Sequence, residues 1–309
     1  VTLSDPLKIW SYFEAGPKAV KSPVLFLPPV CGAADVYFRQ ILNLSARGFR
    51  VIAVDYPQYW SIDAFCHDFE EFLNFKQFDN VDIISANPIK ILQWGVANCA
   101  FFICAFANCA NPNEPHVHIF GASLGGFLAQ KFAEYSALSS STSLSNGESD
   151  QVDARRQNQQ RVASLLLCNS FSNTMVFQRD DIASLFYLLP NFILKRMLRN
   201  GFLRTKDEAI MSANNFMIDQ LSLMSKEKLS SRITLSYRRS NCKTSKISSL
   251  PITIIDVFDK SQFLEMSEHL FNAYPNAKKA HIKSGGCFPF LSRCDEVNLH
   301  IMKPSNLDQ

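Results

Sequence analysis

The stretch FGASLGG, residues 120–126, decides the fold of this chain, because it has the form G-x-S-x-G with Ser123 at its centre. This pattern is typical of a nucleophile elbow, a strained turn between a strand and a helix that exposes the serine hydroxyl. Small residues must flank the serine so that the two backbones can pass, and Gly121 and Gly125 supply them. An apolar run precedes the motif and a helical run follows it, so Ser123 is predicted to occupy a nucleophile position.

Strand-like apolar runs alternate with longer helical patterns on both sides of this turn. We expect strands at residues 24–29, 50–57, 116–123, 162–170, 251–259 and 278–286, and helices at 34–47, 61–77, 125–137, 261–273 and 295–302. Such alternation is typical of an α/β fold, a mostly parallel sheet with helices on both faces. The length of 309 residues is compatible with a single domain over residues 1–309.

Three stretches depart from the alternation. Residues 81–115 read as an atypical insertion. Residues 94–110 within it carry no charge, so they indicate either a packed or poorly ordered insertion, or a membrane span or contact. Residues 138–160 are polar and predict a flexible surface loop. Residues 171–232 are helical and predict a lid region over the elbow, although two extra core helices with no gating role would give the same pattern.

Composition excludes some classes of partner and site. The net charge is only +3 and long runs of Lys or Arg are absent, so no nucleic acid is expected to bind. The nine cysteines are scattered without disulfide-framework or metal-ligand spacing, which indicates free thiols in a reducing, intracellular compartment. We expect no metal site and no cofactor.

A serine nucleophile requires an acid after a later strand and a histidine after the last strand. Asp259 ends the run ITIIDVFD and is expected at the acid position. Asp256 lies inside that run and is expected to be structural.

The base is missing from its expected position. Where Gly-His would follow the last strand, the chain has Gly286 and Cys287. A thiol with a pKa of about 8.5 cannot take a proton from a serine near neutrality as an imidazole can. A nucleophilic Cys287 is the minor alternative, because only His281 and Lys283 lie near it in sequence. The six histidines are all expected to be structural or superficial: His67, His116, His118, His269, His281 and His300.

The oxyanion hole is also altered. The loop after the first predicted strand begins with Pro28 and Pro29, and proline has no N–H to donate. The backbone N–H groups of Val30 and Leu124 remain as oxyanion-hole candidates.

These residues together resemble a known family. LFLPPVCGAADVYFRQIL (25–42), GASLGGFLAQKFAEY (121–135) and AHIKSGGCFPFLSRCDEVNLH (280–300) are similar to the maspardin family of α/β-hydrolase-fold proteins. The resemblance runs from about residue 7 to residue 300 and fails over 81–115 and 138–160. It implies an α/β-hydrolase fold whose elbow serine lacks the usual triad histidine.

The resemblance also implies a cytosolic protein with some peripheral association with endosomal or trans-Golgi membranes. Its expected partners are cytosolic proteins, namely the cytoplasmic tail of a T-cell co-receptor and an aldehyde-dehydrogenase-like protein. Two functions follow as hypotheses: a non-catalytic binding or regulatory protein in trafficking or receptor signalling, and a weak or atypical serine hydrolase acting on an ester or thioester. The missing histidine leaves enzymatic activity undecided and favours the first.

Overall fold

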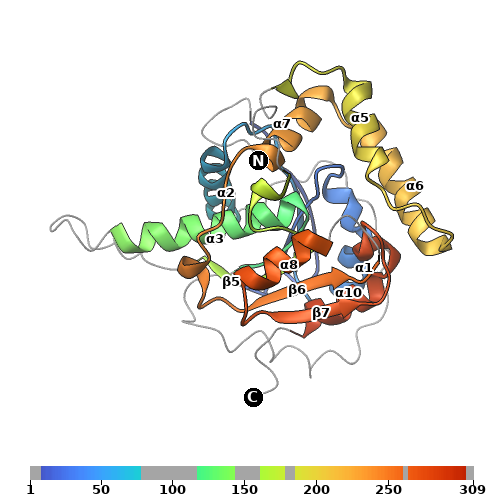
Figure 1. Cartoon of the computed structure of the whole chain (residues 1–309). Coiled ribbons are helices and arrows are strands. Elements are labelled where there is room, and N and C mark those ends of the chain that lie inside the picture. Colours follow the sequence, from blue (N-terminus) through green and yellow to red (C-terminus); the bar gives the residue numbers. More distant parts are fainter. Residues whose placement is uncertain (1–7, 78–116, 143–160, 178–184, 260–263, 304–309) are drawn as a thin grey trace.

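A computed structural model describes residues 8–77, 117–142, 161–177, 185–259 and 264–303 (Figure 1). The predicted insertion at 81–115 lies outside the described residues. So does the predicted loop at 138–160, apart from its first five residues, 138–142.

The described residues form one central sheet with the strand order β1-β3-β2-β4-β5-β6-β7. The strands are β1 (Ser11–Ala15), β2 (Val24–Leu27), β3 (Val51–Asp55), β4 (Val117–Ala122), β5 (Val162–Cys168), β6 (Ile252–Val257) and β7 (Lys278–Ile282). β1 is antiparallel to β3, and every other neighbouring pair is parallel. The predicted, mostly parallel sheet is therefore confirmed. The edge strand β1, which is only partly buried, is not among the predicted strands.

Helices cover both faces of this sheet. They are α1 (Phe38–Ala46), α2 (Ile62–Gln77), α3 (Leu124–Thr142), α5 (Asn191–Asn200), α6 (Glu208–Leu223), α7 (Lys226–Tyr237), α8 (Leu264–Ala273), α9 (Pro289–Ser292) and α10 (Cys294–Met302). Short 3-10 helices occur at η1 (Ala34–Tyr37), η3 (Thr174–Phe177) and η5 (Thr244–Ile247). Figure 1 places α2, α3 and α8 on one face, and α1 and α10 on the other.

Strand β2 shows how one short segment serves both cores. Its four residues are fully buried, and alternate side chains point to opposite faces of a sheet. Leu25 and Leu27 join the hydrophobic cluster under α2, α3 and α8. Val24 and Phe26 join the cluster under α1, α10 and helices α5 to α7. Burial on both faces explains the continuous apolar run in the sequence.

The elbow helix α3 extends further than the sequence indicated. It continues to Thr142, whereas a loop was predicted from residue 138. Serine and threonine have lower helix propensity than alanine, but the cost per residue is a fraction of a kcal/mol, so a helix that is already formed can continue through them.

The segment predicted as a lid contains α5, α6 and α7. In Figure 1, α5 and α6 form an arm at one side of the sheet, joined to the body through α7. Side-chain caps define two of these helices. The Asp207 carboxylate accepts from the N–H groups of Ala209 and Ile210, and Ser225 Oγ accepts from Lys228 N–H. Among the described residues no helix combines the length and apolarity needed to cross a membrane; the uncharged stretch 94–110 lies outside them.

Candidate functional site

The Ser123 elbow has the backbone geometry that the motif predicts. Ser123 adopts φ 50°, in the left-handed region that non-glycine residues rarely occupy. Its N–H donates to the Cys168 carbonyl oxygen at 3.0 Å, which fixes the turn against β5. A Cβ on Gly125 would lie 2.2 Å from the Leu27 carbonyl oxygen, and one on Gly121 would lie 2.4 Å from Gly126 N. Only glycine fits at these two positions, because the backbones approach so closely.

The Ser123 hydroxyl is half-buried and has no partner within the described part of the chain. Its main chain is well fixed, however. The Ser123 carbonyl oxygen accepts from Gly126 N–H and from Ser170 Oγ, at 3.1 and 3.0 Å. The turn therefore holds the serine in place without a base bonded to its Oγ.

Asp259 lies at the carboxyl end of β6, where an acid loop would begin. Its Oδ2 accepts two backbone hydrogen bonds, from Gly285 N–H at 2.7 Å and Gly286 N–H at 2.6 Å. The carboxylate thus holds the turn after β7, just before Cys287. Its Oδ1 accepts no hydrogen bond from the residues that the structure describes. Asp256 is instead buried in β6, and burial raises the pKa of its carboxyl.

Cys287 follows this turn at the position expected for a base. Gly286 has φ 66°, and a Cβ there would meet Ile210 Cγ2 of α6 at 2.7 Å. The Cys287 thiol donates to the Gly201 carbonyl oxygen at 3.6 Å rather than to Ser123. Burial, with a smaller effect from the Asp259 charge, raises the pKa of this thiol. A neutral thiol cannot accept the proton that a serine nucleophile must lose.

Asn169 connects the two halves of the site, and sequence reasoning missed it. It follows β5 with φ 43° and is almost fully buried. Its side-chain amide donates to the carbonyl oxygens of Gly286 and Cys287, at 3.1 and 3.4 Å. Because Cys168, the preceding residue, accepts from Ser123 N–H, Asn169 couples the elbow to the Cys287 turn. The sequence feature that could have identified Asn169 is its position at the end of β5, the strand next to the one that leads into the elbow.

None of the described histidines stands in for the missing base. His118 lies on β4 and bonds Ser164 through Nδ1 at 2.8 Å, about 17 Å of extended chain before Ser123. His281, on the edge strand β7, contacts the Phe258 ring at a tilt and the Phe271 ring edge-on, with ring centroids 4.7 and 5.4 Å apart. The side chains of His67, His269 and His300 lie on α2, α8 and α10. His116 lies outside the described residues.

The oxyanion-hole candidates remain available in the structure. The N–H groups of Val30 and Leu124 donate to no acceptor within the described residues. The loop that carries Val30 contacts Arg232 of α7, whose side chain is completely buried. Arg232 donates to the carbonyl oxygens of Pro29 and Gly32. This buried arginine was not identified from the sequence.

Arg232 is part of a charged cluster at the end of β3. Its guanidinium bonds Asp55 Oδ1 at 3.0 Å and lies 4.4 Å from the ring centroid of Tyr56. Lys228, one turn earlier on α7, also donates to Asp55. Burial, with the nearby charge of Arg232, lowers the pKa of Lys228. The cluster connects α7 to the loop that carries Val30, the oxyanion-hole candidate.

The lid arm packs directly on the Cys287 turn. Phe202 contacts Phe288 edge-on, with ring centroids 4.9 Å apart. Asp207 pairs with Arg293, which also bonds Ser284 beside the turn. The loop between α5 and α6 therefore contacts the turn that carries Cys287. That α5, α6 and α7 form a lid over Ser123 stays a prediction.

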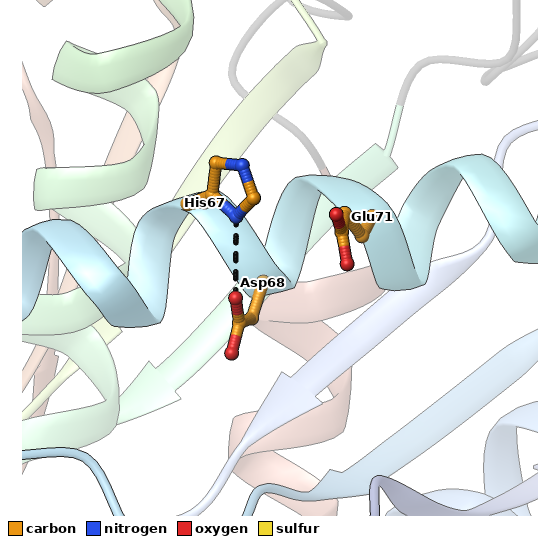
Figure 2. A group of neighbouring side chains, drawn as sticks. All are labelled: His67, Asp68 and Glu71. Carbon is orange, nitrogen blue, oxygen red and sulfur yellow. Dashed lines mark hydrogen bonds and ion pairs between the residues drawn. The ribbon is translucent and has the colours of Figure 1, made fainter. Parts of the chain in front are cut away.

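One cluster among the described residues has the spacing of a metal site. Figure 2 shows His67, Asp68 and Glu71 on α2, with their ligand atoms within 4.8 Å of one another. Asp68 Oδ2 already accepts from Lys8 Nζ at 2.9 Å and from Tyr59 Oη at 2.8 Å. The lysine ammonium thus supplies a positive charge beside this buried carboxylate.

Comparison with solved structures defines the class of the fold. The enol-lactonase from Burkholderia xenovorans matches with a TM-score of 0.64 and 12% identity, covering 97% of each chain. A structure from a study of carboxylesterases of Nitrososphaera gargenis matches with a TM-score of 0.66 and 11% identity, covering 98% of this chain and 96% of the other. The sheet order and the strained serine turn are those of an α/β-hydrolase fold. Identities this low show the fold alone.

Curated relatives define the family. Maspardin from Homo sapiens is 40% identical over 299 residues, which cover 96% of this chain and 79% of the relative. Maspardin from Danio rerio is 38% identical over 299 residues, covering 96% and 78%. No protein-family model matches the sequence. The chain belongs to the maspardin family.

Proposed function

We propose that this chain is a non-catalytic binding or regulatory protein built on an α/β-hydrolase scaffold. The observation that carries this proposal is the neutral thiol of Cys287 at the base position, which donates to the Gly201 carbonyl oxygen and not to Ser123. None of the described histidines lies in a position to replace it. Ser123 can be exposed by the elbow and still remain a weak nucleophile, because nothing removes its proton.

The cellular part of the proposal follows the family. We place the protein in the cytosol and peripherally on endosomal or trans-Golgi membranes, acting in trafficking or receptor signalling. Its partners are cytosolic proteins, such as an aldehyde-dehydrogenase-like protein and, where the receptor exists, the cytoplasmic tail of a T-cell co-receptor. Recovery of such a partner by affinity purification from cells of the source organism supports this part, and its absence from repeated purifications opposes it.

A weak serine hydrolase acting on an ester or thioester is the second candidate. The strained backbone of Ser123 favours it, because such strain persists only where the surrounding structure maintains it. Ser123 would attack the acyl carbon and Asp259 would be the acid, with the N–H groups of Val30 and Leu124 donating hydrogen bonds to the oxyanion. The proton of Ser123 would have to pass to water or to a group of the substrate.

Fluorophosphonate labelling of the purified protein distinguishes the two candidates. We expect negligible labelling of the wild type and of Ser123→Ala. We expect Cys287→His to gain Ser123-dependent labelling by about 100-fold, which is the low end of a general base's contribution. The imidazole would lie beside Asp259, whose Oδ1 is open to accept its N–H.

The matched control places the same substitution elsewhere. Cys294→His changes another partly exposed cysteine, at the start of α10, and should leave labelling unchanged. Strong labelling of the wild type that disappears in Ser123→Ala would overturn the non-catalytic proposal.

A further inference from the structure

The first half of the lid arm carries a concentrated positive charge. Between residues 185 and 206 the chain has five cations and no acidic residue, so the rest of the molecule carries a small net negative charge. The cations are Lys195, Arg196, Arg199, Arg204 and Lys206. Arg196 and Arg199 are exposed on α5, whereas Leu194 of the same helix is fully buried against the body. The helix thus presents a basic face outward.

Exposed apolar side chains lie beside this basic face. The side chains of Phe192 and Leu188 are 70% and 65% exposed, and Leu223 at the end of α6 is 78% exposed. Lys195 Nζ donates to the carbonyl oxygen of Ser222, which places the basic helix next to Leu223. These apolar residues therefore lie beside Lys195, and Phe192 shares one face of α5 with Arg196 and Arg199, four and seven residues further on.

Two aromatic residues continue the same surface onto the body. Tyr187 contacts Trp60 edge-on, with ring centroids 6.1 Å apart, and both are exposed. Lys226 Nζ lies 5.6 Å from the Tyr187 ring centroid. We call this set the lid-tip surface: Trp60, Leu185, Tyr187, Leu188, Phe192, Lys195, Arg196, Arg199, Leu223 and Lys226.

The geometry points to an anionic membrane surface as the occupant of the lid-tip surface, and we propose that the protein docks there. Side chains that line a peptide groove lose most of their exposure to the groove walls, whereas these apolar residues project outward. Projecting Leu, Phe, Trp and Tyr side chains bordered by Lys and Arg match a bilayer interface, where apolar groups enter the headgroup layer and cations meet lipid phosphates. In Figure 1 the arm stands at the outside of the molecule, where a flat surface can reach it.

This docking deepens the peripheral membrane association in the proposed function and rests on that part of it. It does not depend on whether Ser123 reacts. Fluorophosphonate labelling and vesicle binding can therefore fail separately, and each failure identifies the proposal that is wrong.

Vesicle sedimentation of the full chain tests the docking. We expect binding to phosphatidylcholine vesicles that contain about 30% phosphatidylserine, little binding to pure phosphatidylcholine, and loss of binding at about 0.5 M salt. The double variant Arg196→Glu/Arg199→Glu should reduce the bound-to-free ratio at least about tenfold. Leu188→Ser/Phe192→Ser should also reduce it about tenfold, because the apolar insertion is lost.

Two controls match these variants in chemistry and exposure. Lys18→Glu/Lys303→Glu makes the same change in net charge at exposed sites away from the lid. Leu42→Ser/Leu299→Ser removes two leucines that are 50% and 51% exposed on α1 and α10. Both controls should bind like the wild type. All changes lie on the surface, and unchanged thermal unfolding shows that each variant is folded.

Three results would overturn the proposal. The wild type could fail to bind anionic vesicles, or the lid-tip variants could bind as well as their controls. Alternatively, polyglutamate could bind in a manner that Arg196→Glu/Arg199→Glu abolishes while vesicles do not bind, and the surface would then recognise an acidic protein segment instead.

Discussion

At the scale of single residues, the site has a complete nucleophile elbow but lacks a base that could accept the proton of Ser123. Ser123 has the strained backbone and the close glycine packing that attack requires. Asp259 accepts from the backbone of the turn after β7, and that turn carries Cys287 in place of an imidazole. Asn169 joins the turn to the elbow strand. The surrounding hydrogen bonds therefore preserve the shape of a catalytic site around a residue that cannot serve as its base.

Gly125→Ala should destabilise the protein, because the new Cβ would lie 2.2 Å from the Leu27 carbonyl oxygen and backbone cannot move cheaply. We expect a loss of about 3 kcal/mol or more in the free energy of unfolding, measured with urea. Gly201→Ala is the matched control, because its Cβ would meet only the Leu198 carbonyl oxygen at 3.4 Å. A stable Gly125→Ala variant would show that the elbow packing is looser than described.

At the scale of elements, local hydrophobic patterns predict most of the helices and buried strands. The strand that they do not predict, β1, depends on contacts with distant parts of the chain. Buried strands such as β2 have continuous apolar sequences because both faces are covered. Strand β1 was missed because it lies at the edge and is only partly buried, so its pattern is weak. It is fixed by contacts distant in sequence: Glu14 accepts from Arg50 Nε at 2.7 Å and from Lys76 Nζ at 2.6 Å. A reading of local periodicity cannot detect such contacts.

Glu14→Gln should weaken this edge in a pH-dependent way. Burial alone would raise the pKa of Glu14, but the hydrogen bonds and charges of Lys76 and Arg50 outweigh it and lower the pKa below 4.5. The ionised group therefore stabilises the fold fully above about pH 4.5 and loses this effect as the pH falls through its lower folded-state pKa.

We expect Glu14→Gln to cost about 1–3 kcal/mol at pH 7. The difference from wild type should shrink below about pH 4.5, as followed by thermal unfolding from pH 7 to about pH 3. Glu268→Gln, an exposed position on α8, should show no comparable difference at any pH. A constant difference for Glu14→Gln across this range would contradict the ionic explanation.

At the scale of the whole molecule, two hydrophobic clusters enclose the sheet and determine which groups remain accessible. Among the described cysteines, Cys31, Cys66, Cys168 and Cys242 are buried, whereas Cys287 and Cys294 are partly exposed. Burial raises the pKa of Cys31 and of Cys242 to about 12. These buried thiols act as small apolar groups in the core.

Peptide-resolved alkylation of the native protein should follow this order of exposure. At about pH 7.5 we expect Cys294 to react with iodoacetamide at least about tenfold faster than the buried cysteines, because reaction needs both access and thiolate. Cys287 should react more slowly than Cys294, because its pKa is raised. Equal rates at all these positions before denaturation would mean that the core opens readily. In denaturant the rates should converge.

The α/β architecture, the position of the serine turn and the cysteine at position 287 can all be inferred from the amino-acid sequence alone. These features are local: strand and helix periods, the glycines of a tight turn, and a residue type at a strand end. The tertiary structure alone decided that Asn169 bonds the Cys287 turn, that Arg232 supports the oxyanion loop, and that the lid arm gathers cations and apolar groups on one surface. Each of these depends on contacts between segments far apart in the chain, whose geometry is set only when the sheet and its two cores assemble.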